Sequence, residues 1–211
     1  MCVLAMTEVV RVVHRRNSRR RSVGKAYDTA IEVADLIPPD TQLLDVGCGN
    51  GYVAHHLNAL LTNRVTGVDL PETPKARIEY LSYDGKRLPV NDDSYDGVLL
   101  SYVLHHVQDI DLALSEIRRV VRPDGLVVIY EDIPKNRWDN IPGRLHSAKW
   151  QSISGPCTFR RPSEWNQLFA SYGFEVVSER ELSRWRNIFH PMTHILYVLK
   201  ATERSVVINS N

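Results

Sequence analysis

Short apolar runs alternate with stretches of helical periodicity along the first two thirds of the chain. The first run stops at glycines, the third has weaker patterning, and the runs are otherwise apolar along their length, which is typical of strands buried on both faces of a sheet. They lie at residues 43–46, 65–69, 78–83, 95–101 and 126–130. Apolar side chains recur every three or four positions at residues 27–37, 53–61 and 110–121, and this spacing predicts helices. The alternation favours a parallel sheet covered on both faces.

The C-terminal third has a different pattern. Residues 132–160 are rich in Pro, Gly, Trp and Arg and show no period, so we expect an irregular segment there. Apolar positions at 165–172, ended by Gly173, predict a helix. Residues 174–182 and 194–200 predict two strands that pair antiparallel. The whole pattern predicts an α/β fold with a doubly wound, mostly parallel seven-stranded sheet and an antiparallel C-terminal hairpin.

Composition and charge fit one globular domain. The 211 residues are 43% hydrophobic and 24% charged, and they show neither a repeat nor a low-complexity linker. We therefore expect a basic N-terminal segment at 1–24 and a single domain at 25–211. The net charge of +1 gives no reason to expect nucleic acid or a membrane as partner. Five arginines between residues 15 and 21 could contact phosphate, although a solvated segment explains them as well.

Cysteine use and the N-terminus favour a cytoplasmic protein. The three cysteines are Cys2, Cys48 and Cys157, an odd count without disulfide spacing, and no C-x-x-C pair predicts a metal site. The apolar first residues precede the arginines, whereas a secretory signal has the reverse order. No run approaches the roughly 20 apolar residues of a membrane span.

A glycine-rich turn joins the first predicted strand to the next helix. The sequence there is Asp45-Val46-Gly47-Cys48-Gly49-Asn50-Gly51. Glycine adopts positive φ and lets a ligand lie against the backbone, and the first N–H groups of the helix are donors. In an open α/β sheet, ligands bind beyond the carboxyl ends of the strands. A tight connection without a ligand would also explain this turn alone.

Two aspartates favour a ligand. Asp69 ends the second predicted strand, at close to the spacing of about 20 residues that separates a glycine loop from a ribose-binding acid. Asp84 follows the third predicted strand and could accept a hydrogen bond from the exocyclic amine of adenine. One aspartate at a strand end is often only a helix cap. The glycine turn, Asp69 and Asp84 follow three successive strands, and this combination predicts a site for an adenosine-bearing cofactor.

The motifs resemble those of class I S-adenosylmethionine-dependent methyltransferases of the ubiquinone/menaquinone type. Residues 43–51 are similar to the first motif of that family. The later blocks are Leu88-Pro89, Asp93-Ser94-Tyr95-Asp96, Leu104-His105-His106-Val107 and residues 119–125. The resemblance covers residues 25–131 in detail. It implies the fold and S-adenosylmethionine as cofactor, and it is shared by enzymes with many acceptors. We expect a small-molecule acceptor.

The resemblance also implies positions for the cofactor. Asp45 would lie near its amino acid moiety, the glycine turn would pack against it, and Asp69 would bind its ribose. The full implied set is Asp45, Gly47, Cys48, Gly49, Gly51, Asp69, Leu70, Asp84, Gly85 and Ser101, with Leu70, Asp84 and Gly85 at the adenine and Ser101 near the sulfonium. The family has a helix between the second and third strands. Pro71 and Pro74 fall in this short interval, so we expect that helix to be missing or reduced to a turn.

Histidines are the candidates for acid–base chemistry. Methyl transfer is an in-line displacement, and a base is needed only where the acceptor loses a proton. His105 and His106 follow the fourth predicted strand and are suitable bases, although the sequence favours a structural role in the loop. His146, His190 and His194 are weaker candidates.

Residues 132–160 are the predicted acceptor lid. The side chains that could line a pocket there are Arg137, Trp138, Arg144, His146 and Trp150. A surface crossover whose tryptophans complete the core is the alternative.

Three other functions stay open. An NAD-dependent oxidoreductase would accommodate Asp69, but the glycines are spaced G-x-G-x-G rather than G-x-G-x-x-G. A non-catalytic cofactor-binding regulator is compatible with every motif, since no single residue defines catalysis. An RNA methyltransferase would rest on the N-terminal arginines, and its RNA affinity would fall steeply with salt.

Overall fold

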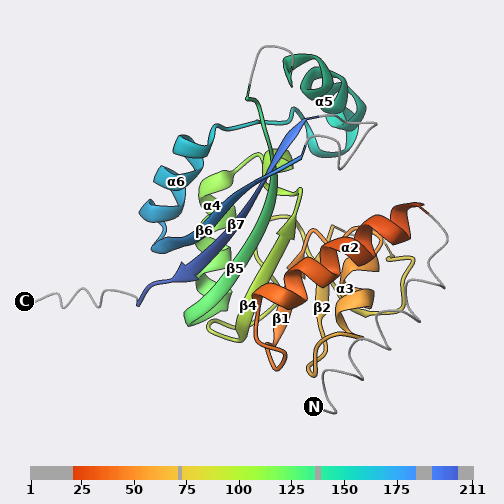
Figure 1. The fold of residues 1–211 in the computed structure, drawn as a ribbon, viewed down its shortest axis with the longest axis vertical. Helices are drawn as coiled ribbons and strands as arrows, with labels where there is room; N and C mark the ends of the chain where they lie inside the picture. The colour runs from red at the N-terminus through yellow and green to blue at the C-terminus, as the bar shows by residue number, and fades with distance from the viewer. Residues whose placement is uncertain (1–20, 71–72, 136–138, 184–191, 204–211) are drawn as a thin grey trace, which may run out of the picture.

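The computed structural model describes residues 21–70, 73–135, 139–183 and 192–203, and its centre is one seven-stranded sheet (Figure 1). The strands are β1 (Leu43–Val46), β2 (Thr66–Asp69), β3 (Glu79–Ser82), β4 (Tyr95–Ser101), β5 (Val121–Ile133), β6 (Phe174–Leu182) and β7 (Thr193–Ala201). The helices are α2 (Arg21–Leu36), α3 (Tyr52–Leu57), α4 (Ile110–Val120), α5 (Asn140–Ser154) and α6 (Pro162–Ser171), with a 3-10 turn, η1, at Leu104–His106.

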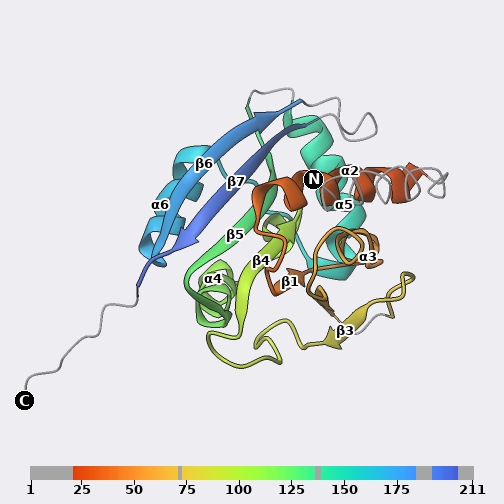
Figure 2. The same cartoon turned by 60° about the horizontal axis from the view of Figure 1, so that its bottom comes forward.

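The strand order is β3-β2-β1-β4-β5-β7-β6, and Figure 2 shows β3 at one edge and β6 at the other. Strands β1 to β5 pair parallel, whereas β7 pairs antiparallel with both β5 and β6. The predicted fold class is therefore confirmed. After β3 the chain returns to the other side of β1, so the order reverses between β1 and β4. Ligands of open α/β sheets bind at such a reversal.

Helices cover both faces of the sheet because consecutive strand residues point to opposite sides. Leu43 and Leu99 pack with α2 and α3 in one apolar cluster. Leu44 and Val98 pack with α4 and α6 in the other, which includes the fully buried Trp165. Figure 1 shows α2 and α3 on the opposite face from α4 and α6. In the described part of the chain, no helix has the length and apolar composition to cross a bilayer.

Two helices differ from the expected pattern. α2 begins at Arg21, inside the predicted basic segment, whereas Arg15, Arg16, Arg19 and Arg20 lie outside the described residues. α3 ends at Leu57, before the predicted end at residue 61, and Leu60 and Leu61 continue in turns that bond to the Leu57 carbonyl. No helix occurs between β2 and β3 at residue 70 or at 73–78, as the two prolines predict.

The prediction of an irregular segment at 132–160 was wrong for residues 140–154, whereas residues 155–160 lie outside helices and strands as expected. Residues 140–154 form α5, which lies beyond the end of the sheet where β5 stops (Figure 1). Pro142 is in the first helical turn, where its missing N–H costs nothing. Periodicity did not reveal the helix because apolar residues lie on its solvent side: Ile141 is 57% exposed and Leu145 is 69% exposed.

Candidate functional site

The glycine turn forms the first wall of the candidate site, between β1 and α3. Gly47, Gly49 and Gly51 have φ values of 71°, 52° and 75°, all in the left-handed region. A Cβ on Gly47 would lie 2.5 Å from Cγ2 of Val103, so the loop after β4 packs directly against this backbone. A Cβ on Gly49 would have no atom within 4 Å. The turn is therefore packed at Gly47 and open at Gly49, where a ligand can approach the chain.

A buried carboxylate lies beside this turn. Asp45 is 1% exposed, and its Oδ2 accepts no hydrogen bond from the described residues. Burial, and then the negative charge of Asp69, raise the pKa of Asp45 to about 7. A buried polar atom without a partner is unusual in a folded protein. A ligand with a positive charge or hydrogen-bond donors would satisfy it.

Asp69 connects the end of β2 to the glycine turn. Its Oδ2 accepts a hydrogen bond from the Gly49 N–H at 2.6 Å, and its Oδ1 accepts one from the Leu70 N–H at 2.7 Å. Each carboxylate oxygen has a second lone pair, so ribose hydroxyls could still donate to it. The partly buried Cys48 also lies here, since its Sγ would be 2.8 Å from a Cβ on Gly67 of β2. Burial and the charges of Asp45 and Asp69 raise the pKa of Cys48, so this thiol stays protonated.

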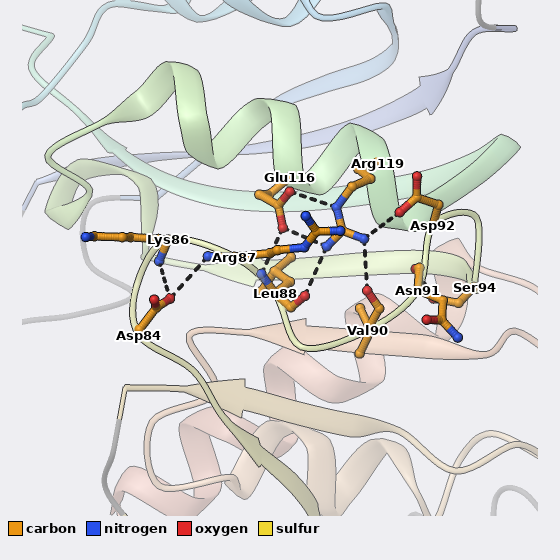
Figure 3. Close-up of polar contacts among 10 residues, drawn as sticks. All are labelled: Asp84, Lys86, Arg87, Leu88, Val90, Asn91, Asp92, Ser94, Glu116 and Arg119. Atoms are coloured by element: carbon orange, nitrogen blue, oxygen red, sulfur yellow. Dashed lines mark hydrogen bonds and ion pairs between the residues drawn. The ribbon is translucent and has the colours of Figure 1, made fainter.

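The predicted adenine residues lie together at the end of β3. Leu70 is 39% exposed, and its Cδ2 would be 3.3 Å from a Cβ on Gly85. Asp84 is exposed, and its Oδ1 accepts hydrogen bonds from the backbone N–H groups of Lys86 and Arg87 (Figure 3). These bonds lower the pKa of Asp84. They give Asp84 a turn-capping role, and its contact with adenine stays a prediction.

An ion-pair network holds together the blocks that carry the family resemblance. Arg119 on α4 donates to the carbonyls of Leu88 and Val90 and to the carboxylates of Asp92 and Glu116 (Figure 3). Glu116 in turn accepts a hydrogen bond from the Leu88 N–H at 2.8 Å. The Leu88-Pro89 block is thereby fixed to the helix that precedes β5. These contacts stabilise the fold around the block.

A strained residue follows β4. Ser101, the predicted neighbour of the sulfonium, is half-buried and ends the strand. Tyr102 comes next with φ at 62°, a conformation that costs about 1–3 kcal/mol in a residue with a side chain and is often found at functional sites. The Lys25 ammonium lies 4.9 Å from the centre of the Tyr102 ring. The sequence did not predict Tyr102 as a site residue, because tyrosine is not a residue type that indicates a positive φ.

Three histidines meet beyond β4. His105 and His106 are on η1, and His146 comes from α5 some forty positions later. His105 Nε2 lies 3.4 Å from His146 Nε2, which lies 3.2 Å from His106 Nε2. The sequence predicted the first two as catalytic candidates and named His146 as a weaker one, but it did not predict that all three lie together. His190 lies outside the described residues.

The environment of these histidines sets their charges. His105 is 1% exposed and its Nδ1 lies 2.7 Å from Oε2 of Glu131. Burial alone would lower the pKa of His105, but the charge and hydrogen bond of Glu131 leave it raised. Burial, and then the neighbouring His105 and His146, lower the pKa of His106 to about 3. Glu131 was not predicted, although it directly follows the apolar run at 126–130 and thus lies at the carboxyl edge of a parallel strand.

Some predicted lid residues join this cluster. The Trp150 ring lies 5.2 Å from that of His106, and Phe159 stacks on His105 at 5.1 Å. Arg144 is exposed. Arg137 and Trp138 lie outside the described residues. His194 is buried apart from the cluster, and its Nδ1 pairs with Asp132 at 2.5 Å.

The chain is similar in sequence and fold to known methyltransferases. The model of a family described as a methyltransferase domain matches residues 15–179. This chain belongs to that family. It is a member of the class I S-adenosylmethionine-dependent methyltransferases, as the sequence motifs predicted. A crystal structure of an S-adenosylmethionine-dependent methyltransferase from Mesorhizobium loti has the same fold, with a TM-score of 0.63 and 18% identity over 83% of this chain and 97% of that one.

Curated relatives carry several different names. The chain is 36% identical over 107 residues to the mitochondrial arginine-hydroxylase NDUFAF5 of Rattus norvegicus, covering 47% of this chain and 31% of that protein. It is 37% identical to a demethylmenaquinone methyltransferase of Streptomyces avermitilis over 53% of this chain and 48% of that protein. It is 28% identical to YodH of Bacillus subtilis, named as an uncharacterized methyltransferase, over 82% of this chain and 76% of that protein. The chain thus spans only about a third of the rat protein.

Proposed function

We propose that this chain transfers a methyl group from S-adenosylmethionine to a small-molecule acceptor. The observation that carries the proposal is the buried carboxylate of Asp45, whose Oδ2 has no partner among the described residues. It lies beside a glycine turn that is open at Gly49. S-adenosylmethionine carries a sulfonium and an ammonium group, and either positive charge near Asp45 would offset the cost of burying the carboxylate.

The charges of the site favour this cofactor over a dinucleotide. Asp45 and Asp69 lie close enough for Asp69 to raise the pKa of Asp45. Two carboxylates beside the glycine turn would repel a pyrophosphate, which binds where backbone N–H groups face no acidic side chain. One of those N–H groups, that of Gly49, already donates to Asp69. The charge distribution therefore disfavours an NAD-dependent oxidoreductase.

The residues present fit S-adenosylmethionine along the carboxyl edge of the sheet. Asp45 would hold the amino acid moiety and Asp69 the ribose, while Leu70 and Gly85 would flank the adenine. The cofactor supplies the methyl group on a sulfonium, so no covalent intermediate with the protein is needed. Ser101 and the strained Tyr102 would form the boundary between the cofactor and the acceptor. Their role is to align the acceptor atom and to exclude water.

The acceptor end is walled by the histidine cluster and its aromatic neighbours. The rings of Phe159 and Trp150 pack against His105 and His106, so apolar and polar side chains meet here. Such a mixture suits a small aromatic or quinone-like molecule with a polar group. The relative named as a demethylmenaquinone methyltransferase supports a small-molecule acceptor of this kind.

A labelling experiment tests the acceptor class. The full chain is incubated with S-adenosylmethionine bearing a radioactive methyl group in three separate reactions. Each reaction contains one fraction of a cell extract: metabolites, protein or RNA. We expect label in the metabolite fraction, and its loss in Asp69→Ala but not in Asp28→Asn, an exposed aspartate on α2. Label in RNA or protein alone would overturn the small-molecule proposal. Binding of the cofactor without label in any fraction would favour a regulator.

A further inference from the structure

Three imidazole nitrogens face one another in the histidine cluster. In the described part of the chain, His105, His106 and His146 form a group whose ligand atoms all lie within 4.8 Å of one another. We propose that these three histidines bind one divalent transition-metal ion of the zinc type through their Nε2 atoms. The proposal does not depend on the methyl donor, since it concerns different side chains and can be tested without any cofactor. The cysteine spacing gave no hint of it.

Two of the three nitrogen separations match those between ligands of one metal ion. Nitrogen ligands lie about 2.0–2.1 Å from zinc, and at the tetrahedral angle two of them are roughly 3.3–3.4 Å apart. The observed Nε2 separations from His146 are 3.4 Å to His105 and 3.2 Å to His106. A three-histidine set leaves a fourth position of the tetrahedron for water or a substrate atom, as in catalytic rather than structural zinc sites.

Hydrogen bonding among the three rings explains their arrangement less well than a bound metal ion does. A ring nitrogen has one position in the plane, which holds either a proton or a lone pair. His146 Nε2 has close contacts with two other Nε2 atoms, and one such position cannot form good hydrogen bonds in both directions. A single cation placed between the rings would accept all three lone pairs at once.

Groups around the rings orient them for this role. Glu131 accepts the Nδ1–H of His105, so Nε2 carries the lone pair when the ring is neutral, and a carboxylate behind a histidine is the usual support of a metal ligand. The Ser154 hydroxyl lies 3.0 Å from His106 Nδ1 and can accept its proton. The Cys157 thiol also contacts Nδ1 of His106, at 3.4 Å, so it lies on the side away from the three Nε2 atoms.

Charge and burial favour a cation. Glu131 is 0% exposed and contacts His105, so its negative charge would offset part of the charge of a metal ion. Imidazole ligands suit zinc, copper, iron and nickel better than magnesium or calcium. The Phe159 and Trp150 rings shield two of the histidines from water, which strengthens the electrostatic attraction.

Calorimetry on the full chain tests the site. After treatment with a chelator, the protein is titrated with ZnCl₂, and CoCl₂ is then used to record visible absorption. We expect one ion per chain, a tetrahedral cobalt spectrum and a rise of the melting temperature on zinc addition. His146→Gln should weaken zinc binding by more than roughly 100-fold, and Glu131→Gln by about 10- to 100-fold. His55→Ala, on α3, is the matched control and should bind as the parent does.

The alternatives give different results. Circular dichroism and thermal unfolding of each variant without metal establish that it is folded. No zinc binding by the folded parent chain would overturn the proposal and leave the cluster as a proton-sharing group. Zinc binding that His146→Gln retains, or a cobalt spectrum of an octahedral complex, would also overturn it, because the ion would then lie elsewhere or on other ligands.

Discussion

Nδ1 of His105 lies 2.7 Å from Oε2 of Glu131, and the two side chains are 1% and 0% exposed. The other oxygen of Glu131 accepts the Leu104 N–H at 2.7 Å, so one carboxylate holds both the ring and the backbone of η1. This turn also carries His106 and lies between the proposed cofactor site and the predicted lid. The position of the acceptor end therefore depends on one buried acid of β5.

Truncation of Glu131 should destabilise the protein strongly. Glu131→Ala leaves His105 and the Leu104 N–H buried without their acceptor, and we expect a loss of about 3–5 kcal/mol in the free energy of unfolding. Urea denaturation measures it. Glu175→Ala, an exposed acid on β6, should change stability by less than about 0.5 kcal/mol. Equal effects of the two substitutions would show that the buried pair contributes nothing special.

The ionised Asp45 carboxylate should lower the free energy of unfolding at high pH. Its folded pKa of about 7 exceeds the value of an unfolded aspartate, so the folded chain binds the proton more tightly. Stability from this group is thus present at low pH and is lost as pH rises towards 7. Since one pKa unit corresponds to about 1.4 kcal/mol, Asp45→Asn should gain roughly 2–3 kcal/mol relative to the parent chain between pH 5 and pH 8.

The same substitution should abolish tight cofactor binding, because the positive ligand loses its buried counter-charge. Urea denaturation at several pH values and calorimetry with S-adenosylmethionine check the two effects. Asp28→Asn serves as the exposed control. If the stability difference between Asp45→Asn and the parent does not change with pH, the pKa of Asp45 is not raised.

Two glycines of one turn should respond differently to alanine. Both adopt positive φ, which costs an alanine about 1–2 kcal/mol. Gly47→Ala would in addition place its Cβ 2.5 Å from Val103, so we expect a further loss of about 1–3 kcal/mol, partly restored in the double variant with Val103→Ala. Gly49→Ala meets no atom, so it should remain folded but bind the cofactor weakly. Thermal unfolding and calorimetry measure both, and equal stability of the two single variants would contradict the packing at Gly47.

Arg119 should matter for folding and not for binding. Arg119→Ala removes donors from two carbonyls and two carboxylates around the Leu88-Pro89 block. We expect a loss of about 2–3 kcal/mol, since the side chain is only 14% exposed. Arg122→Ala, whose side chain is 41% exposed, is the milder control. A variant that keeps its stability but loses cofactor affinity would place Arg119 in the site after all.

Local pattern was sufficient to predict the strands and most helices. The mostly apolar run 95–101 and the apolar stripe at 110–121 give β4 and α4, because most of the apolar side chains in each element are buried. It failed at α5, whose apolar residues Ile141 and Leu145 face solvent. The placement of the glycine turn, Asp69 and Asp84 along one edge was predictable, because each follows a strand end of one sheet. His146 and Glu131 were not, because their partners are far away in sequence and only tertiary packing brings them to His105.

Calorimetric titration of the purified chain with S-adenosylmethionine, S-adenosylhomocysteine and NADH shows whether the chain binds an adenosyl methyl donor. We expect saturable binding of both adenosyl compounds, a loss of at least about tenfold in affinity for Asp69→Ala, and no binding of NADH, and this is the central expectation for the protein. No binding of either adenosyl compound by folded protein, or tighter binding of NADH, would contradict it.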